Sequence, residues 1–168
     1  MFFWRKKKSK FEEPQVEPLF MAVPSMEEEL SHAYARAAAS MAEFRSHIER
    51  KGDHICSAKL RFKDPNESDR TGKDILLFLW LTAVEYNPAS GSYVGTFFEV
   101  PPELSEWHFA GQLLEFDGVD VFDWMVNYDG ILHGGFTLRV NRRRLPEGER
   151  EAFDRYVGVR QWVQWDGH

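Results

Sequence analysis

Histidine and hydroxyl side chains are the residues of this chain whose chemistry is best suited to catalysis. A small hydrolase or transferase could use His133 or His54 as a general base beside a carboxylate, with Ser57 or Thr137 as the nucleophile. The histidines show no His-x-x-x-His or other metal-ligand spacing, and the sequence reveals no partner that would activate either hydroxyl. We therefore retain an enzyme as an alternative function and expect no catalytic residue, no metal and no cofactor.

Three other groups of residues have structural explanations. Cys56 is the single cysteine and lies among apolar residues, which predicts a buried, unreactive thiol in a reducing, cytoplasmic setting. Asp117, Asp120 and Asp123 lack the twelve-residue pattern of a helix-loop-helix calcium site, so we interpret them as turn and strand-end residues. The run Arg142–Arg144 is flanked by glutamates and predicts a solvated strand end.

The stretch Val121–Arg144 positions the main candidate site. Asp129 and Gly130 form the dipeptide typical of a two-residue type I′ hairpin turn, in which both residues need a positive φ. Counting away from this turn predicts the pairs Tyr128–Ile131, Asn127–Leu132, Val126–His133, Met125–Gly134, Trp124–Gly135, Phe122–Thr137 and Asp120–Arg139.

Alternation along the two strands gives the hairpin two different faces. We expect one of them to be the core, with Met125, Asn127, Leu132, Phe136, Leu138 and Val140. The other carries aromatic, titratable and cationic groups, and we interpret it as a candidate binding face formed by Trp124, Tyr128, His133, Thr137 and Arg139. The glycine pair Gly134 and Gly135 predicts a bulge, a bend or the close approach of another group to the backbone. We expect the ring of Trp124 to cover Gly135, and a ligand site is the alternative.

A long helix is expected before the sheet. Ser25 with Glu28 has capping-box spacing, Gly52 is a stop signal, and apolar residues between them recur every three or four positions. We expect this stripe to pack on the sheet, with a helix-helix seam of a homodimer as the alternative.

Strand signals follow at residues 54–63, 75–86, 92–100 and 112–116, with residues 64–74 expected as a loop. A short helix is expected over Glu149–Tyr156. The predicted fold is α+β: a long N-terminal helix packed on a curled antiparallel sheet of about five or six strands, with a short C-terminal helix.

The expected domain organisation is one domain at residues 25–168 after a tail and proline-rich linker at residues 1–24. Near its N-terminus the chain has three aromatic residues, Phe2, Phe3 and Trp4, followed by five basic residues. We expect a flexible tail. The alternative is a membrane-apposed accessory protein, with weak membrane-surface contact through residues 1–10. The net charge of −6 excludes an electrostatic nucleic-acid binder.

The segments DWMVNYDGILHGGFTLRVNRRR and GEREAFDRY resemble the YegJ-like family of bacterial domains of unknown function. The resemblance extends over about residues 30–157 and includes the alanine-rich helix Ala33–Phe44, the strand Ala58–Phe62 and Trp80. It implies a single bacterial, cytoplasmic domain and supplies no reaction. The sequence as a whole therefore predicts a noncatalytic binding module for an unknown protein or small-molecule ligand, because aromatic residues and arginine are the usual interface anchors.

Overall fold

The structure is a computed structural model that describes residues 16–164, with side chains described from residue 27 onward. The expectations for the tail at residues 1–10 lie outside these residues. The helical segments, including two 3-10 turns, are α2 (Val16–Ala39), α3 (Met41–Glu49), α4 (Pro65–Thr71), η2 (Pro102–Leu104), η3 (Gly118–Asp120), α5 (Phe136–Arg144) and α6 (Glu147–Val157). The strands are β1 (Ile55–Lys63), β2 (Leu76–Asn87), β3 (Ser92–Phe97), β4 (Leu113–Phe116), β5 (Val121–Tyr128), β6 (Ile131–Gly134) and β7 (Gln161–Trp162).

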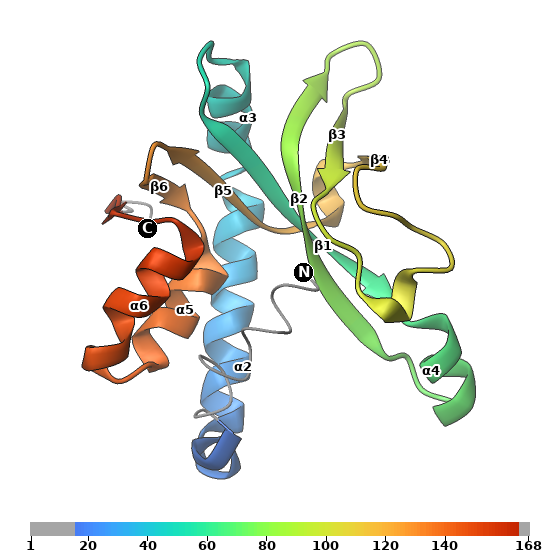
Figure 1. The fold of residues 1–168 in the computed structure, drawn as a ribbon, viewed down its shortest axis with the longest axis vertical. Coiled ribbons are helices and arrows are strands. Elements are labelled where there is room, and N and C mark those ends of the chain that lie inside the picture. Colours follow the sequence, from blue (N-terminus) through green and yellow to red (C-terminus); the bar gives the residue numbers. More distant parts are fainter. Residues whose placement is uncertain (1–15, 165–168) are drawn as a thin grey trace.

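The fold is α+β, as predicted, with one sheet in the order β4-β3-β2-β1-β5-β6-β7. The sheet has seven strands in the described part of the chain, so the expected five or six is wrong. The extra strand β7 pairs parallel with β6, because the chain returns to the sheet edge after α6. Figure 1 shows α5 and α6 together on the β6 side of the molecule, with α2 running beside them and α4 at the far end of β1 and β2.

The single long helix expected from Ser25 to Gly52 is two helices. α2 already begins at Val16, so residues 16–24 are helical where an extended linker was expected. The helices separate at Ser40, whose hydroxyl donates to the carbonyl of Arg36 at 2.7 Å. A serine hydroxyl that bonds to the carbonyl four residues back bends a helix. The same hydroxyl accepts the indole N–H of Trp124 at 2.9 Å, so the bend is tied to the sheet.

Residues 64–74, expected as a loop, contain α4. Asp64 caps this helix by accepting the N–H of Glu67 at 3.0 Å, Pro65 occupies its first turn, and Gly72 ends it with φ of 71°. A capping aspartate, a proline inside the start and a glycine past the end are helix signals. All three signals are present in the sequence, so the loop expected from the polarity of the segment is wrong.

The β5–β6 hairpin has the expected register from Tyr128–Ile131 back to Met125–Gly134. Beyond Gly134 the predicted pairs with Gly135, Thr137 and Arg139 are wrong. Gly134 and Gly135 have φ of 70° and 66°, which turns the chain out of the strand, and α5 begins at Phe136. Residues 136–144 thus form a helix where the prediction continued a strand.

Candidate functional site

The five residues expected to form one binding face are divided by the tertiary structure. Trp124 and Thr137 have no exposed surface, so both belong to the interior. Tyr128, His133 and Arg139 are half-buried. The assumption that all five are accessible together is therefore wrong, because α3 covers the part of the sheet that carries Trp124.

The covering contact is an aromatic stack. The ring of Phe44 in α3 lies parallel to Trp124 at a centroid distance of 5.2 Å and to Tyr93 of β3 at 6.2 Å. A Cβ atom added to Gly134 would lie 2.3 Å from the carbonyl oxygen of Trp124 and 2.7 Å from its ring. Trp124 thus fills the space beside Gly134, one residue before the expected Gly135, and the glycine is explained by packing rather than by a ligand.

Thr137 is part of a buried polar network. Its hydroxyl donates to the carboxylate of Asp123 and accepts from the ammonium group of Lys59 at 3.2 Å. Burial raises the pKa of Asp123, whereas Lys59 and the hydrogen bonds from Thr137 lower it. These contacts engage the hydroxyl in holding β1, β5 and α5 together, so Thr137 is not paired with a histidine base.

Arg139 also has structural partners. Its Nε donates to the carbonyl of Gly134 at 2.8 Å, and its guanidinium lies over the ring of Trp162 at 5.4 Å. Burial lowers the pKa of this arginine, and Asp123 partly opposes the effect. Arg139 therefore satisfies the backbone at the end of β6 and is only partly available to a ligand.

The remaining two residues, Tyr128 and His133, lie in a cluster with three residues that the sequence did not single out together: Glu43, His47 and the neighbouring His54. The Nδ1 atom of His47 lies 2.6 Å from the Tyr128 hydroxyl, and the His47 and His133 rings are 4.6 Å apart. His54 stacks on Tyr128 at 4.5 Å, and its Nε2 lies 2.7 Å from the carbonyl of His47.

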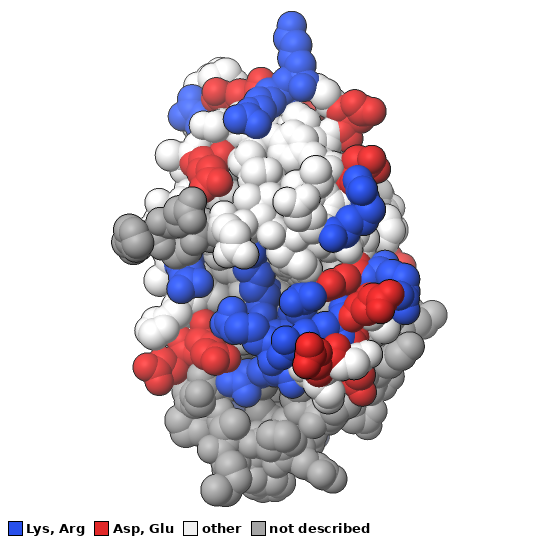
Figure 2. Space-filling view, turned by 90° about the vertical axis from the view of Figure 1, so that its left-hand side faces the viewer, with Lys and Arg blue, Asp and Glu red and all other residues white. Residues whose placement is uncertain are grey.

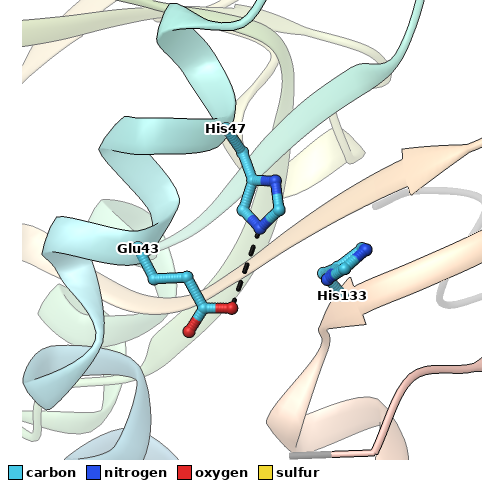
Figure 3. Close-up of side chains that lie close together, drawn as sticks. All are labelled: Glu43, His47 and His133. Atoms are coloured by element: carbon cyan, nitrogen blue, oxygen red, sulfur yellow. Dashed lines mark ion pairs between the residues drawn. The ribbon is translucent and has the colours of Figure 1, made fainter.

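Glu43, His47 and His133 are the described residues that could hold a metal ion, with one ligand atom each within 4.8 Å of the others. Figure 3 shows the three side chains converging from α3 and β6. Burial, aided by nearby His133 and Arg50, lowers the pKa of His47 to about 4, and burial also lowers that of His133. At neutral pH the imidazole of His47 is therefore uncharged, and its 3.7 Å contact with Glu43 is not a salt bridge. In the sequence, the only sign of this cluster is the i,i+4 spacing of Glu43 and His47, which places both side chains on one helix face.

The opposite face of the sheet contains a cavity. Met125 and Asn127 alternate with Trp124 and Tyr128 along β5, so they point away from α3. We name this cavity the groove; its volume is about 220 Å³, and it is lined by Ile55, Ser57, Trp80, Thr82, Phe98, Met125, Asn127, Leu138, Tyr156 and Val157. Leu132, Phe136, Leu138 and Val140 are buried, as expected for the core face, but Met125 and Asn127 line a cavity instead of solid core.

A second, more polar hollow of about 730 Å³ lies at the β5–β6 turn. Ile55 and Asn127 line both cavities. The other residues of this polar hollow are Lys51, Gly52, Asp53, His54, Tyr128, Asp129, Gly130 and Gly158. An occupant of the groove thus has an apolar region on one side and polar groups within reach on the other.

Figure 2 shows Lys and Arg side chains gathered with Asp and Glu beside them on the face where α5 and α6 lie. The run Arg142–Arg144 ends α5, so its interpretation as a solvated strand end is wrong. Arg142 makes a bidentate contact with Asp154 at 2.7 and 2.9 Å, and Arg144 pairs with Glu29 at 3.0 Å. Arg142 thus joins α5 to α6, and Arg144 joins α5 to α2.

Cys56 and the aspartates largely follow the sequence interpretation. Cys56 is buried, and burial raises the pKa of its thiol to about 11. Asp117 and Asp120 form the capping box of the short turn η3. Asp123 differs from both, because it is fully buried in the network with Thr137.

Among the residues that the structure describes, no helix is both long and apolar enough to cross a membrane. The chain matches the model of a family described as uncharacterised proteins conserved in bacteria and named DUF2314. No curated protein and no solved structure matches the chain.

The matched segment is residues 27–160, which includes the histidine cluster and the whole lining of the groove. It agrees with the resemblance to bacterial domains of unknown function, whereas the narrower YegJ-like label remains a sequence resemblance. Since the match covers most of the 168 residues, the chain belongs to the DUF2314 family of uncharacterised proteins conserved in bacteria.

Proposed function

We propose that this protein is a noncatalytic binding module whose ligand, a small and mainly apolar molecule, occupies the groove. The observation that carries the proposal is a cavity of about 220 Å³ between the sheet and α6, lined mostly by apolar side chains. Ligand sites in proteins are typically concave and apolar, with a few polar groups that orient the ligand. Ser57, Thr82, Asn127 and Tyr156 supply polar groups to this lining.

Exposure of apolar side chains around the groove supports the proposal. Phe98 is 59% exposed and Ile55 is 53% exposed, and both contribute to the lining. Large apolar groups gathered at one concave surface are typical of a binding site. The polar-aromatic face predicted from the sequence lacks this accessibility, because Trp124 is covered.

The adjoining polar hollow narrows the class of ligand. A molecule with an apolar body in the groove would place a polar end near Asn127, which lines both cavities. An aromatic compound with one polar group meets this description, since Trp80, Phe98 and Tyr156 contribute aromatic rings to the lining. We therefore favour a small amphipathic aromatic ligand.

Methyl-group NMR of the full chain with indole as the probe tests this proposal. Methionine methyl groups give separate signals, and Met125 lines the groove whereas Met41 is packed elsewhere against the core. We expect indole to shift the Met125 signal in a saturable way and to leave the Met41 signal in place. A Met125 signal that does not respond to indole would contradict the proposal.

Two valine variants give a matched control. Val157→Trp should fill the groove and weaken indole binding at least about tenfold, because the indole of the new side chain competes for the same space. Val119→Trp adds the same group at a position that is 92% exposed and outside the groove lining. If both variants bound indole with equal affinity, indole would have to bind outside the groove, which would contradict the proposal.

A further inference from the structure

We propose that Glu43, His47 and His133 form a binding site for a divalent transition metal ion, with Zn²⁺ as the closest match to the ligands. This site lies on the α3 side of the sheet and does not depend on the groove. Two imidazole nitrogens and one carboxylate oxygen form a ligand set that binds Zn²⁺ in proteins and leaves a fourth position open. The sequence alone predicted no metal.

The three ligand atoms must move only slightly closer together to coordinate one ion. Glu43 and His47 are four residues apart on α3 and so lie on the same helix face, which is turned toward His133 of β6. The three ligand atoms lie within 4.8 Å of one another. Tetrahedral coordination with bonds of about 2.1 Å places ligand atoms roughly 3.4 Å apart. The Glu43 and His47 atoms are already 3.7 Å apart, so the remaining movement is mainly between His133 and these two residues.

His47 is held in an orientation suited to a metal ligand. Its Nδ1 atom is engaged by the Tyr128 hydroxyl at 2.6 Å, which leaves Nε2 directed toward Glu43 at 3.7 Å. A hydrogen bond to the non-ligating nitrogen fixes the tautomer and the ring plane of a metal-binding histidine. Tyr128 is itself fixed by stacking on His54 at 4.5 Å. Tyr128 is therefore a positioning residue for the site.

The three residues differ in their exposure to solvent. His47 is 5% exposed, His133 is half-buried and Glu43 is exposed. An ion can therefore enter past Glu43 and His133 while His47 provides a fixed ligand. Because two of the three ligands are nitrogen, the site should prefer Zn²⁺ and Co²⁺ over Mg²⁺ and Ca²⁺, which take oxygen ligands.

Isothermal titration calorimetry of the untagged full chain with Zn²⁺, Co²⁺ and Mg²⁺ tests the proposal. We expect one equivalent of Zn²⁺ or Co²⁺ to bind and Mg²⁺ not to compete. Bound Co²⁺ should give the intense visible absorption of a tetrahedral or five-coordinate ion. Absence of Zn²⁺ binding, or binding of Mg²⁺ with equal affinity, would overturn the proposal.

Variants at the two accessible ligands avoid a folding defect. His133→Ala and Glu43→Gln should each weaken Zn²⁺ binding by more than about 100-fold, since loss of an outer partner alone costs 10 to 100-fold. Tyr128→Phe should weaken it about tenfold and alter the Co²⁺ spectrum. His32→Ala, at an exposed histidine of α2 outside the cluster, is the matched control and should bind Zn²⁺ normally. Equal losses in His32→Ala and His133→Ala would assign the ion to nonspecific surface histidines and overturn the site.

Discussion

The hydroxyl group of Thr137 donates a 2.5 Å hydrogen bond to the carboxylate of Asp123 in the interior of the protein. The same carboxylate accepts the backbone N–H groups of Thr137 at 2.8 Å and Phe136 at 3.1 Å. Asp123 in β5 thus caps the N-terminus of α5, although it lies outside that helix. This contact explains why the chain leaves the hairpin at Gly135 and begins a helix.

Replacement of this buried carboxylate should destabilise the protein strongly. Asp123→Asn keeps the shape of the side chain but puts an NH₂ donor in place of one of the oxygens that accept the N–H groups of Phe136 and Thr137. Each buried donor left without its acceptor costs about 1 to 3 kcal/mol. We expect a loss of this size in the free energy of unfolding, measured by circular dichroism in urea. Asp69→Asn, at an exposed position of α4, is the control, and a loss of similar size in both variants would contradict the capping role.

Alanine at Gly134 should cost far more than alanine at Gly72. Both glycines have φ near 70°, so both variants suffer the backbone strain of about 1 to 2 kcal/mol that an L-residue meets there. At Gly72 the new Cβ meets no atom within 4 Å, whereas at Gly134 it meets the backbone of Trp124. Overpacking should add at least about 2 kcal/mol to the loss in Gly134→Ala. Equal midpoints in urea for the two variants would show that the backbone around Trp124 yields freely.

Ser40→Ala should leave the indole N–H of Trp124 without its acceptor. An unsatisfied buried donor costs about 1 to 3 kcal/mol, so the unfolding midpoint should fall. Ser46→Ala is a matched control in α3, because the Ser46 hydroxyl is exposed and bonds only to the carbonyl of Ala42 at 3.0 Å. That variant should change stability by less than about 0.5 kcal/mol. A loss in Ser46→Ala equal to that in Ser40→Ala would indicate a general effect of serine in these helices.

The Cys56 thiol should be unreactive at mildly alkaline pH. Burial raises its pKa from 9.0 to about 11, so the thiolate fraction at pH 8 falls roughly 100-fold relative to the unfolded chain. We expect iodoacetamide to label the native protein at least about 100-fold more slowly than protein in urea. Labelling at the same rate in both states would contradict the burial of this residue.

The same shift predicts a pH dependence of stability. Because the pKa of Cys56 is raised in the folded state, the folded protein holds the thiol proton more tightly than the unfolded chain does. Its contribution to stability is fully present below pH 9 and is lost as the pH rises from 9 to about 11. Comparison of native protein with Cys56→Ala isolates this contribution, and the wild-type protein should show the steeper loss. If the free energy of unfolding changed with pH in the same way for both proteins, the predicted contribution of Cys56 would be contradicted.

The sequence by itself determined the local geometry of the hairpin and most of the strands. Asp129 and Gly130 adopt φ of 48° and 91°, so the Asp-Gly turn fixed the register through Met125–Gly134. Such turns and apolar runs act over a few residues, and their chemistry is readable without knowledge of the fold. The α4 signals around Asp64 and Gly72 were equally local and could have been recognised.

Only the tertiary structure decided which surfaces are accessible and which distant residues meet. A strand pattern shows that Trp124 and Met125 face opposite sides, but it does not show that α3 covers one side while the groove lies on the other. Likewise, the sequence places His47 and Tyr128 81 residues apart, and their hydrogen bond depends on how α3 packs on the sheet. Burial and long-range contacts arise from the packing of whole helices and strands against one another. That packing decides which side of the hairpin is buried, which side lines the groove and where the histidine cluster forms.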